Sequence, residues 1–158
     1  MKKVFAIALL IMSFSLISLA QNTFSVFVAP EYRVGNFTHS VNAPGWEVSG
    51  TYNFVSKFGM TADADGVYHN GSATYGALFG PQFTLVTKPK FDAYIHGLAG
   101  IAHGNSTSAF SYAFGGGVDI PVSKSWSIRP AQLDYLAVSA PKGYVNTLRY
   151  SGGLVFRF

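Results

Sequence analysis

Apolar residues alternate with small or polar ones along almost the whole chain after residue 22, and this period of two constrains the fold most strongly. The C-terminal segment is the clearest case, because its large apolar residues occupy alternate positions from Leu148 to Phe158. Successive side chains of a strand point to opposite faces, so the pattern predicts strands with one apolar face. Similar segments occur at 23–33, 46–54, 58–69, 74–85, 91–101, 110–120 and 126–137. The sequence therefore predicts an all-β fold of eight strands.

Two local signals refine this strand pattern. Asn70-Gly71 separates the third and fourth segments, and this dipeptide is a strong signal for a two-residue hairpin. In segment 126–137 the apolar phase changes, because Ile128 and Leu133 cannot share a face without one extra residue between them. Pro130 lies at the change and lacks a backbone donor, so we predict a β-bulge there.

The first twenty residues have the features of an export signal. Lys2 and Lys3 precede an apolar run from Val4 to Leu19, and small residues end the run at Ala20. This predicts a cleaved signal peptide over 1–20 and one mature domain over 21–158. An uncleaved membrane anchor is the alternative, but the run is short for one. No later segment has the ~18 apolar residues of a spanning helix, so a mature chain in a membrane would cross it as strands.

Charged residues are scarce and unevenly placed. They form 11% of the chain, against roughly 25% in soluble domains. All seven carboxylates fall on the non-apolar faces, among Gly, Ala and Ser, although Asp134 does so only if the bulge exists. The lysines after residue 20 lie in turns. A secreted β-sandwich would instead carry Lys, Glu and Thr on its solvent-facing strands. The pattern favours an eight-stranded antiparallel up-and-down transmembrane β-barrel with a polar interior.

The interior of such a barrel is just wide enough for side chains, so its charges are predicted to pair in a packed network. The first and last strands must pair to close the barrel. We therefore expect Glu31 to compensate at least one of Arg33 and Arg149. The predicted network comprises Glu31, Arg33, Glu47, Asp63, Asp65, Asp92, Asp119, Asp134 and Arg149.

Connections and aromatic residues predict an orientation. Tight turns are expected around 55–57, 86–90 and 121–125, and longer loops around 35–44 and 138–145. Short periplasmic turns and longer external loops are typical of outer-membrane barrels, and an even strand number places both termini in the periplasm. Aromatic residues gather near both ends, as expected for two membrane interfaces.

The signal-like N-terminus, the eight amphipathic segments and the terminal Tyr150-Ser-Gly-Gly-Leu-Val-Phe-Arg-Phe158 together resemble the small outer-membrane barrels of the OmpA/OmpX and opacity-protein type, in their barrel-only form. Trp46-Glu-Val-Ser-Gly-Thr-Tyr and Ile128-Arg-Pro-Ala-Gln-Leu-Asp-Tyr are similar to segments of compact members. The resemblance implies a Gram-negative outer membrane, with its lipid and lipopolysaccharide as partners. It also implies a C-terminal signal for the outer-membrane assembly machinery, formed by Tyr150, Leu154, Phe156 and Phe158.

Other site chemistry has weaker support. The lack of cysteine excludes disulfides, thiol nucleophiles and Cys-ligated zinc. Asp63-Ala-Asp65-Gly66 resembles the start of a calcium loop, but the later ligands are missing. A metal site at His39, His69 and His103 is a lesser alternative to solvated histidines. We expect no metal, cofactor or catalytic site, and the net charge of +4 is too mild to indicate nucleic acid.

Three functions remain open at this level. The first is a non-enzymatic barrel with a filled interior and a structural or surface-interaction role, whose surface ligand the sequence does not name. The second is a narrow porin for small solutes. The third is a lipid A-modifying enzyme using Ser, His and a carboxylate at the rim.

Overall fold

The computed structural model describes residues 23–35, 41–104, 106–141 and 143–158. The predicted signal peptide, His39 and Lys142 lie outside these ranges. Eight strands are present: β1 Thr23–Gly35, β2 Val41–Val55, β3 Phe58–His69, β4 Ser72–Lys88, β5 Phe91–Gly104, β6 Thr107–Pro121, β7 Trp126–Ala140 and β8 Gly143–Arg157.

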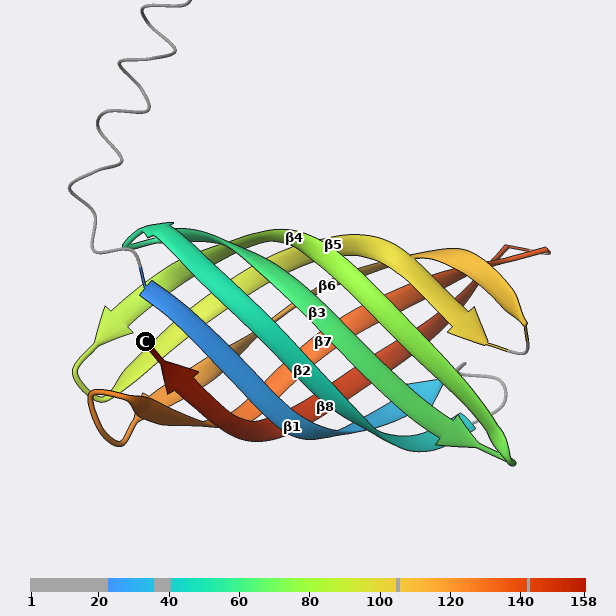
Figure 1. The fold of residues 1–158 in the computed structure, drawn as a ribbon, viewed down its shortest axis with the longest axis horizontal. Coiled ribbons are helices and arrows are strands. Elements are labelled where there is room, and N and C mark those ends of the chain that lie inside the picture. The colour runs from blue at the N-terminus through green and yellow to red at the C-terminus, as the bar shows by residue number, and fades with distance from the viewer. Residues whose placement is uncertain (1–22, 36–40, 105, 142) are drawn as a thin grey trace, which may run out of the picture.

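The strands form one closed barrel in chain order (Figure 1). Each strand pairs antiparallel with the next, and β1 pairs with β8 to close the ring. The predicted eight-stranded up-and-down fold is therefore confirmed. Closure leaves no sheet edge with unpaired backbone groups. No helix among the described residues is long and apolar enough to cross a membrane.

The two ends of the barrel carry different sets of connections. The turn end carries the β2–β3, β4–β5 and β6–β7 connections and the C-terminal residue Phe158. The hairpin end carries the β1–β2, β3–β4, β5–β6 and β7–β8 connections (Figure 1).

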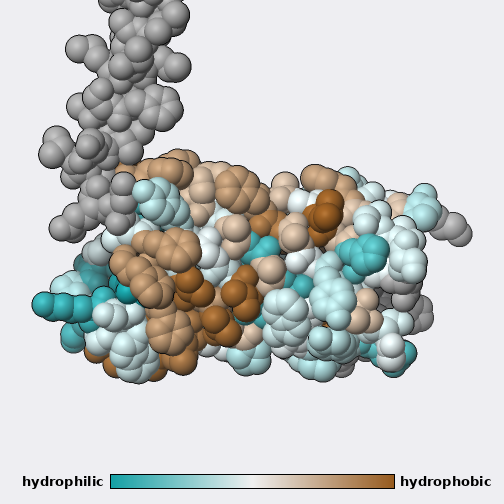
Figure 2. All heavy atoms as spheres, viewed as in Figure 1, coloured by the Kyte–Doolittle hydropathy of each residue, from teal (hydrophilic) through white to brown (hydrophobic). Residues whose placement is uncertain are grey.

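The two faces of the barrel wall have opposite chemistry. Large apolar side chains point outward, and Val28, Phe79 and Phe114 are 47%, 56% and 62% exposed. Figure 2 shows such residues as a hydrophobic area over the middle of the wall and toward the turn end. Carboxylates and guanidinium groups point inward, and all of them are buried except Asp92 and Arg157, which are partly exposed at the turn end. This distribution is the reverse of a water-soluble fold and matches the predicted register.

The predicted bulge in β7 is present and its position is now defined. The pairing of β7 with β8 passes from Arg129–Gly153 to Gln132–Ser151, so β7 contributes one extra residue at Pro130–Ala131. The hydroxyl of Tyr150 donates to the carbonyl oxygen of Pro130 over 3.0 Å. This bond satisfies a bulge carbonyl that would be costly to leave unpaired next to hydrocarbon.

The loop prediction at 138–145 is wrong. β7 continues to Ala140 and β8 begins at Gly143, so two residues join the strands instead of a long loop. Val138 pairs with Val145 and Ser139 pairs with Tyr144. The ladder therefore includes residues whose composition indicated a loop. The predicted β3–β4 hairpin at Asn70-Gly71 is present and equally tight, and both residues have positive φ. The hairpin end therefore lacks the expected long loop between β7 and β8.

The register predicts a depth-dependent cost for charge on the outer wall. Leu154 lies on the outward face of β8 and is 43% exposed, whereas Phe158 is the last residue at the turn end. We expect Leu154→Arg to destabilise the barrel by about 2–4 kcal/mol and Phe158→Arg by about 0–1 kcal/mol. Urea unfolding in lipid vesicles measures both, and equal costs would contradict the proposed depth of Leu154.

Candidate functional site: the buried ionic network

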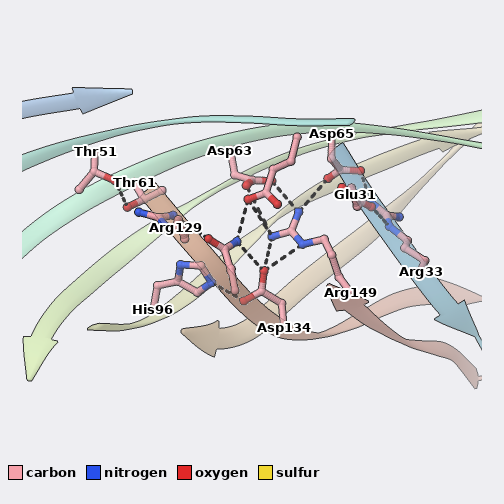
Figure 3. A network of polar contacts seen from close by, with 12 residues as sticks. Glu31, Arg33, Thr51, Thr61, Asp63, Asp65, His96, Arg129, Asp134 and Arg149 are labelled. Atoms are coloured by element: carbon pink, nitrogen blue, oxygen red, sulfur yellow. Dashed lines mark hydrogen bonds and ion pairs between the residues drawn. The ribbon is translucent and has the colours of Figure 1, made fainter. Parts of the chain in front are cut away.

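A continuous set of ionic and polar contacts runs through the interior of the barrel (Figure 3). It begins with Arg157 and Asp92 at the turn end and ends with Arg33 and Glu31 toward the hairpin end. Strands from all around the barrel contribute to it, so distant parts of the sequence meet at its centre. We call this set the interior network.

Arg149 of β8 is the centre of the network. Its Nη2 lies 2.7 Å from Oδ2 of Asp134, and its Nη1 lies 3.0 Å from Oδ1 of Asp63. Asp65 and Glu47 lie farther away, at 3.5 and 3.8 Å. The Arg149 side chain is fully buried, as are its nearest partners. Four carboxylates from β2, β3 and β7 thus surround one guanidinium group.

Glycines make room for this arrangement. The Cβ of any larger residue at Gly76 would clash with the carboxylate of Asp65, and one at Gly115 would clash with that of Asp134. Each glycine lies directly opposite its carboxylate on the adjacent strand, where the narrow interior leaves no space for two side chains. The Gly-rich inner face in the sequence therefore reflects the packing of buried carboxylates.

Arg33 extends the network toward the hairpin end. It forms ion pairs with Glu31 on its own strand and with Asp65 on β3. Asp65 also contacts Arg149 and therefore lies between the two arginines. Arg33 and Arg149 are direct neighbours in the β1–β8 ladder, so shared carboxylates offset the repulsion of adjacent like charges.

Arg129 extends the network toward the turn end. Its Nε donates to Oδ1 of Asp119 over 2.6 Å, and its Nη1 donates to Oε1 of Gln132 over 2.7 Å. The guanidinium carbon lies 4.1 Å from the ring centre of Phe27 and 4.5 Å from that of Tyr94. Cation–π contact with two rings stabilises a buried cation beyond its ion pair.

Gln132 joins the two halves of the network. Its Oε1 accepts from Arg129 and from the hydroxyl of Tyr94, while its Nε2 donates to Glu47 and Asp134. A side-chain amide can accept and donate at once, which neither a carboxylate nor a guanidinium group can do. Gln132 is therefore suited to link a cationic layer with an anionic one.

Negative groups outnumber positive ones inside the barrel. All seven carboxylates of the chain face inward, against four arginines. His96 adds a donor, because its Nε2 lies 2.7 Å from Oδ1 of Asp134. Oε2 of Glu31 and Oε2 of Glu47 are buried without a hydrogen-bond partner. The arginines are thus essential to the charge balance, and losing one leaves buried carboxylates uncompensated.

Apolar residues and a shallow cavity complete the interior. Leu78, Leu98, Ala113 and Leu136 form a buried cluster beside the network, and Leu136 lies two residues beyond Asp134 toward the hairpin end. At the turn end a polar cavity of about 230 Å³ is lined by Asp92, Tyr94, Asp119, Arg129 and Arg157, among others. Arg129 lines this cavity and also contacts the linking residue Gln132.

The structure places all nine predicted network residues on the inner face. Glu31 pairs with Arg33, one of its two expected partners, and forms no ion pair with Arg149. Arg149 points instead toward carboxylates of β3 and β7. Strand pairing indicates only which residues are neighbours on adjacent strands, whereas the contact of Arg149 with β3 crosses the interior of the barrel. Sequence reasoning missed four network members: His96, Arg129, Gln132 and Arg157. His96 and Gln132 are not among the acidic and arginine side chains from which the network was predicted, Arg129 lies next to the bulge, and Arg157 is the last residue of β8.

The described residues give little support to the other chemistry considered above. No three His, Asp or Glu side chains in the described ranges converge on a possible metal position. At the hairpin end, Nδ1 of His103 lies 2.8 Å from Oγ of Ser108. All seven carboxylates point into the barrel, so none completes a Ser-His-carboxylate triad with His103 on the outer wall.

Comparison with known proteins identifies the fold. No protein-family model matches the sequence, and no curated protein matches it significantly. Among solved structures, Neisserial surface protein A superposes with a TM-score of 0.70 at 11% identity, over 87% of this chain and 97% of that one. OprG from Pseudomonas aeruginosa gives 0.65 at 10% identity, over 87% and 96%. Ail, the attachment invasion locus protein of Yersinia pestis, gives 0.57 at 17% identity, over 87% and 97%.

The chain has the fold of the small outer-membrane β-barrels. The match covers nearly the full length of each compared protein, so it includes the whole ring of strands. At these identities the likeness concerns the fold alone.

The network geometry predicts which charges are energetically coupled. Arg149→Gln should cost about 3–5 kcal/mol, because it leaves several buried carboxylates without their cation. Asp134→Asn and Arg149→Gln should couple by about 0.5–3 kcal/mol in a double-mutant cycle. Urea unfolding in lipid vesicles measures each corner of the cycle.

Glu31→Gln provides the matched control, because Glu31 pairs with Arg33 and forms no ion pair with Arg149. Its coupling to Arg149→Gln should be the smaller of the two. Equal coupling energies in both cycles would contradict the contacts described for Arg149.

Proposed function

We propose that this protein is an integral outer-membrane barrel with a closed interior and a structural role in the membrane. The observation that carries the proposal is the placement of the side chains, because apolar residues cover the outer wall and charged residues fill the interior. An apolar surface that surrounds the whole barrel would aggregate in water and is stable in hydrocarbon. The outer-membrane proteins of the same fold support this location.

The interior network supports a closed barrel over a narrow porin. Gln132, Asp134 and Arg149 are at most 1% exposed, so the centre of the barrel is packed against water from both ends. The polar cavity at the turn end stops at Arg129 and Tyr94, which the network holds in place. A passage for solutes would require several buried ion pairs to separate together, at a high cost in free energy.

The outer surface supports the remaining parts of the proposal. The two-residue β3–β4 and β7–β8 connections expose little chain, which favours a structural role over surface recognition by long loops. Lipid and lipopolysaccharide would contact the apolar wall. Tyr150, Leu154, Phe156 and Phe158 all lie on the outward face of β8, where the assembly machinery could read them as a terminal signal.

A planar-bilayer measurement tests the closed interior. We expect the purified protein to insert without producing unitary current steps, because the charged centre excludes water. A porin of known conductance in the same bilayer serves as the positive control. Reproducible steps from this protein would favour the narrow porin and contradict a closed barrel.

Thiol labelling tests the orientation in whole cells. Lys57 lies at the β2–β3 turn and Asn70 at the β3–β4 hairpin, and both are exposed. With the turn end in the periplasm, an impermeant reagent should label Asn70→Cys and leave Lys57→Cys unlabelled until the outer membrane is opened. The chain has no native cysteine, so each variant carries a single thiol. The opposite labelling would invert the orientation.

A further inference from the structure

The exposed lysines of the described chain gather at one end of the barrel. Lys57 lies in the β2–β3 connection, Lys88 ends β4, Lys90 lies in the β4–β5 connection, and Lys124 lies in the β6–β7 connection. Each of the three connections at the turn end therefore carries at least one exposed ammonium group. Figure 2 shows hydrophilic side chains projecting at this end beside a hydrophobic area.

No acidic side chain neutralises these lysines from outside the barrel. All seven carboxylates face the interior, and the two nearest to this end, Asp92 and Asp119, are paired with Arg157 and Arg129. The C-terminal carboxylate of Phe158 lies at the same end, but four ammonium groups outnumber it. The outer rim of the turn end is thus cationic.

A belt of aromatic rings lies next to the lysines on the outer wall. Phe58 stacks near Phe54 and contacts Phe83, with ring centres 6.1 and 5.0 Å apart, and Phe24 lies 6.1 Å from Phe158. Trp126 lies beside Phe156 on β7 and β8. Rings at the hydrocarbon boundary with ammonium groups just beyond them place positive charge at the depth of lipid headgroups.

We propose that the turn end is an electrostatic docking surface for anionic phospholipid headgroups in the adjacent leaflet. The lysines would lie against headgroup phosphates while the aromatic belt stays in the acyl region. A lysine near an anionic lipid surface contributes about 1 kcal/mol, or roughly fivefold, and this attraction is screened by salt. The inference rests on the proposed membrane location and adds a lipid preference confined to one end.

The two tryptophans allow the lipid preference to be measured separately at each end of the barrel. Trp126 lies in the aromatic belt of the turn end, and Trp46 lies on the outer wall in the hairpin half of β2. Trp46→Phe and Trp126→Phe each leave one reporter. The protein is reconstituted in bilayers of phosphatidylcholine and phosphatidylglycerol in which one lipid at a time has brominated acyl chains, which quench tryptophan fluorescence on contact.

We expect Trp126 to be quenched several-fold more by brominated phosphatidylglycerol than by brominated phosphatidylcholine at low salt, and Trp46 to show no such preference. Lys57→Gln, Lys88→Gln, Lys90→Gln and Lys124→Gln together should abolish the preference, whereas the four Lys→Arg changes should retain it. High salt should abolish it in the unmodified chain, which gives the same test without relying on the folding of a quadruple variant.

Equal quenching of Trp126 by both lipids, or a preference that survives the Gln changes, would overturn the docking surface while leaving the membrane location intact. If neither tryptophan were quenched by either lipid, the barrel would not be in the bilayer. That result would overturn the proposed function, and the docking surface with it.

Discussion

The structure depends on the pairing of Arg149 with the carboxylates that surround it. A closed ring of eight strands encloses a narrow space, and the chain directs all seven of its carboxylates into that space. Without buried cations such an interior would repel itself and draw in water. Arg149 at the centre, with Arg33 and Arg129 on either side, offsets that repulsion and connects strands that are not neighbours in the ring. The ladders close the wall, and the network fills and fixes its interior.

This arrangement also accounts for the composition. A buried ionic network is a weak source of net stability, since desolvation offsets much of the attraction. The alternative, an apolar interior, is unfavourable in a membrane barrel for a different reason. The outer face must be apolar, and an equally apolar inner face would leave the strands without a preferred register. Charged residues on one face and hydrocarbon-facing residues on the other define that register, because a shift by one residue would exchange the two faces.

The molecule differs strongly between its two ends. At the turn end, lysines lie in the connections, phenylalanines lie on the outer wall, and a polar cavity inside the ring is lined by Arg129. At the hairpin end, tyrosines such as Tyr68 and Tyr75 pair edge to face. These differences provide a physical basis for a fixed orientation and for different lipid contacts at each end.

The sequence by itself determined the strands, their register and the ring, because a period of two is local and is repeated eight times. It also indicated the bulge, since Pro130 and the phase change between Ile128 and Leu133 are readable from neighbouring residues. Only the tertiary structure decided which charges meet. Arg149 contacts Asp63 across the barrel, and Gln132 joins Arg129 to Glu47, because closure brings together strands far apart in the chain. The structure also decided that the β7–β8 ladder continues to the Ala140–Gly143 pair, where local composition had indicated a loop.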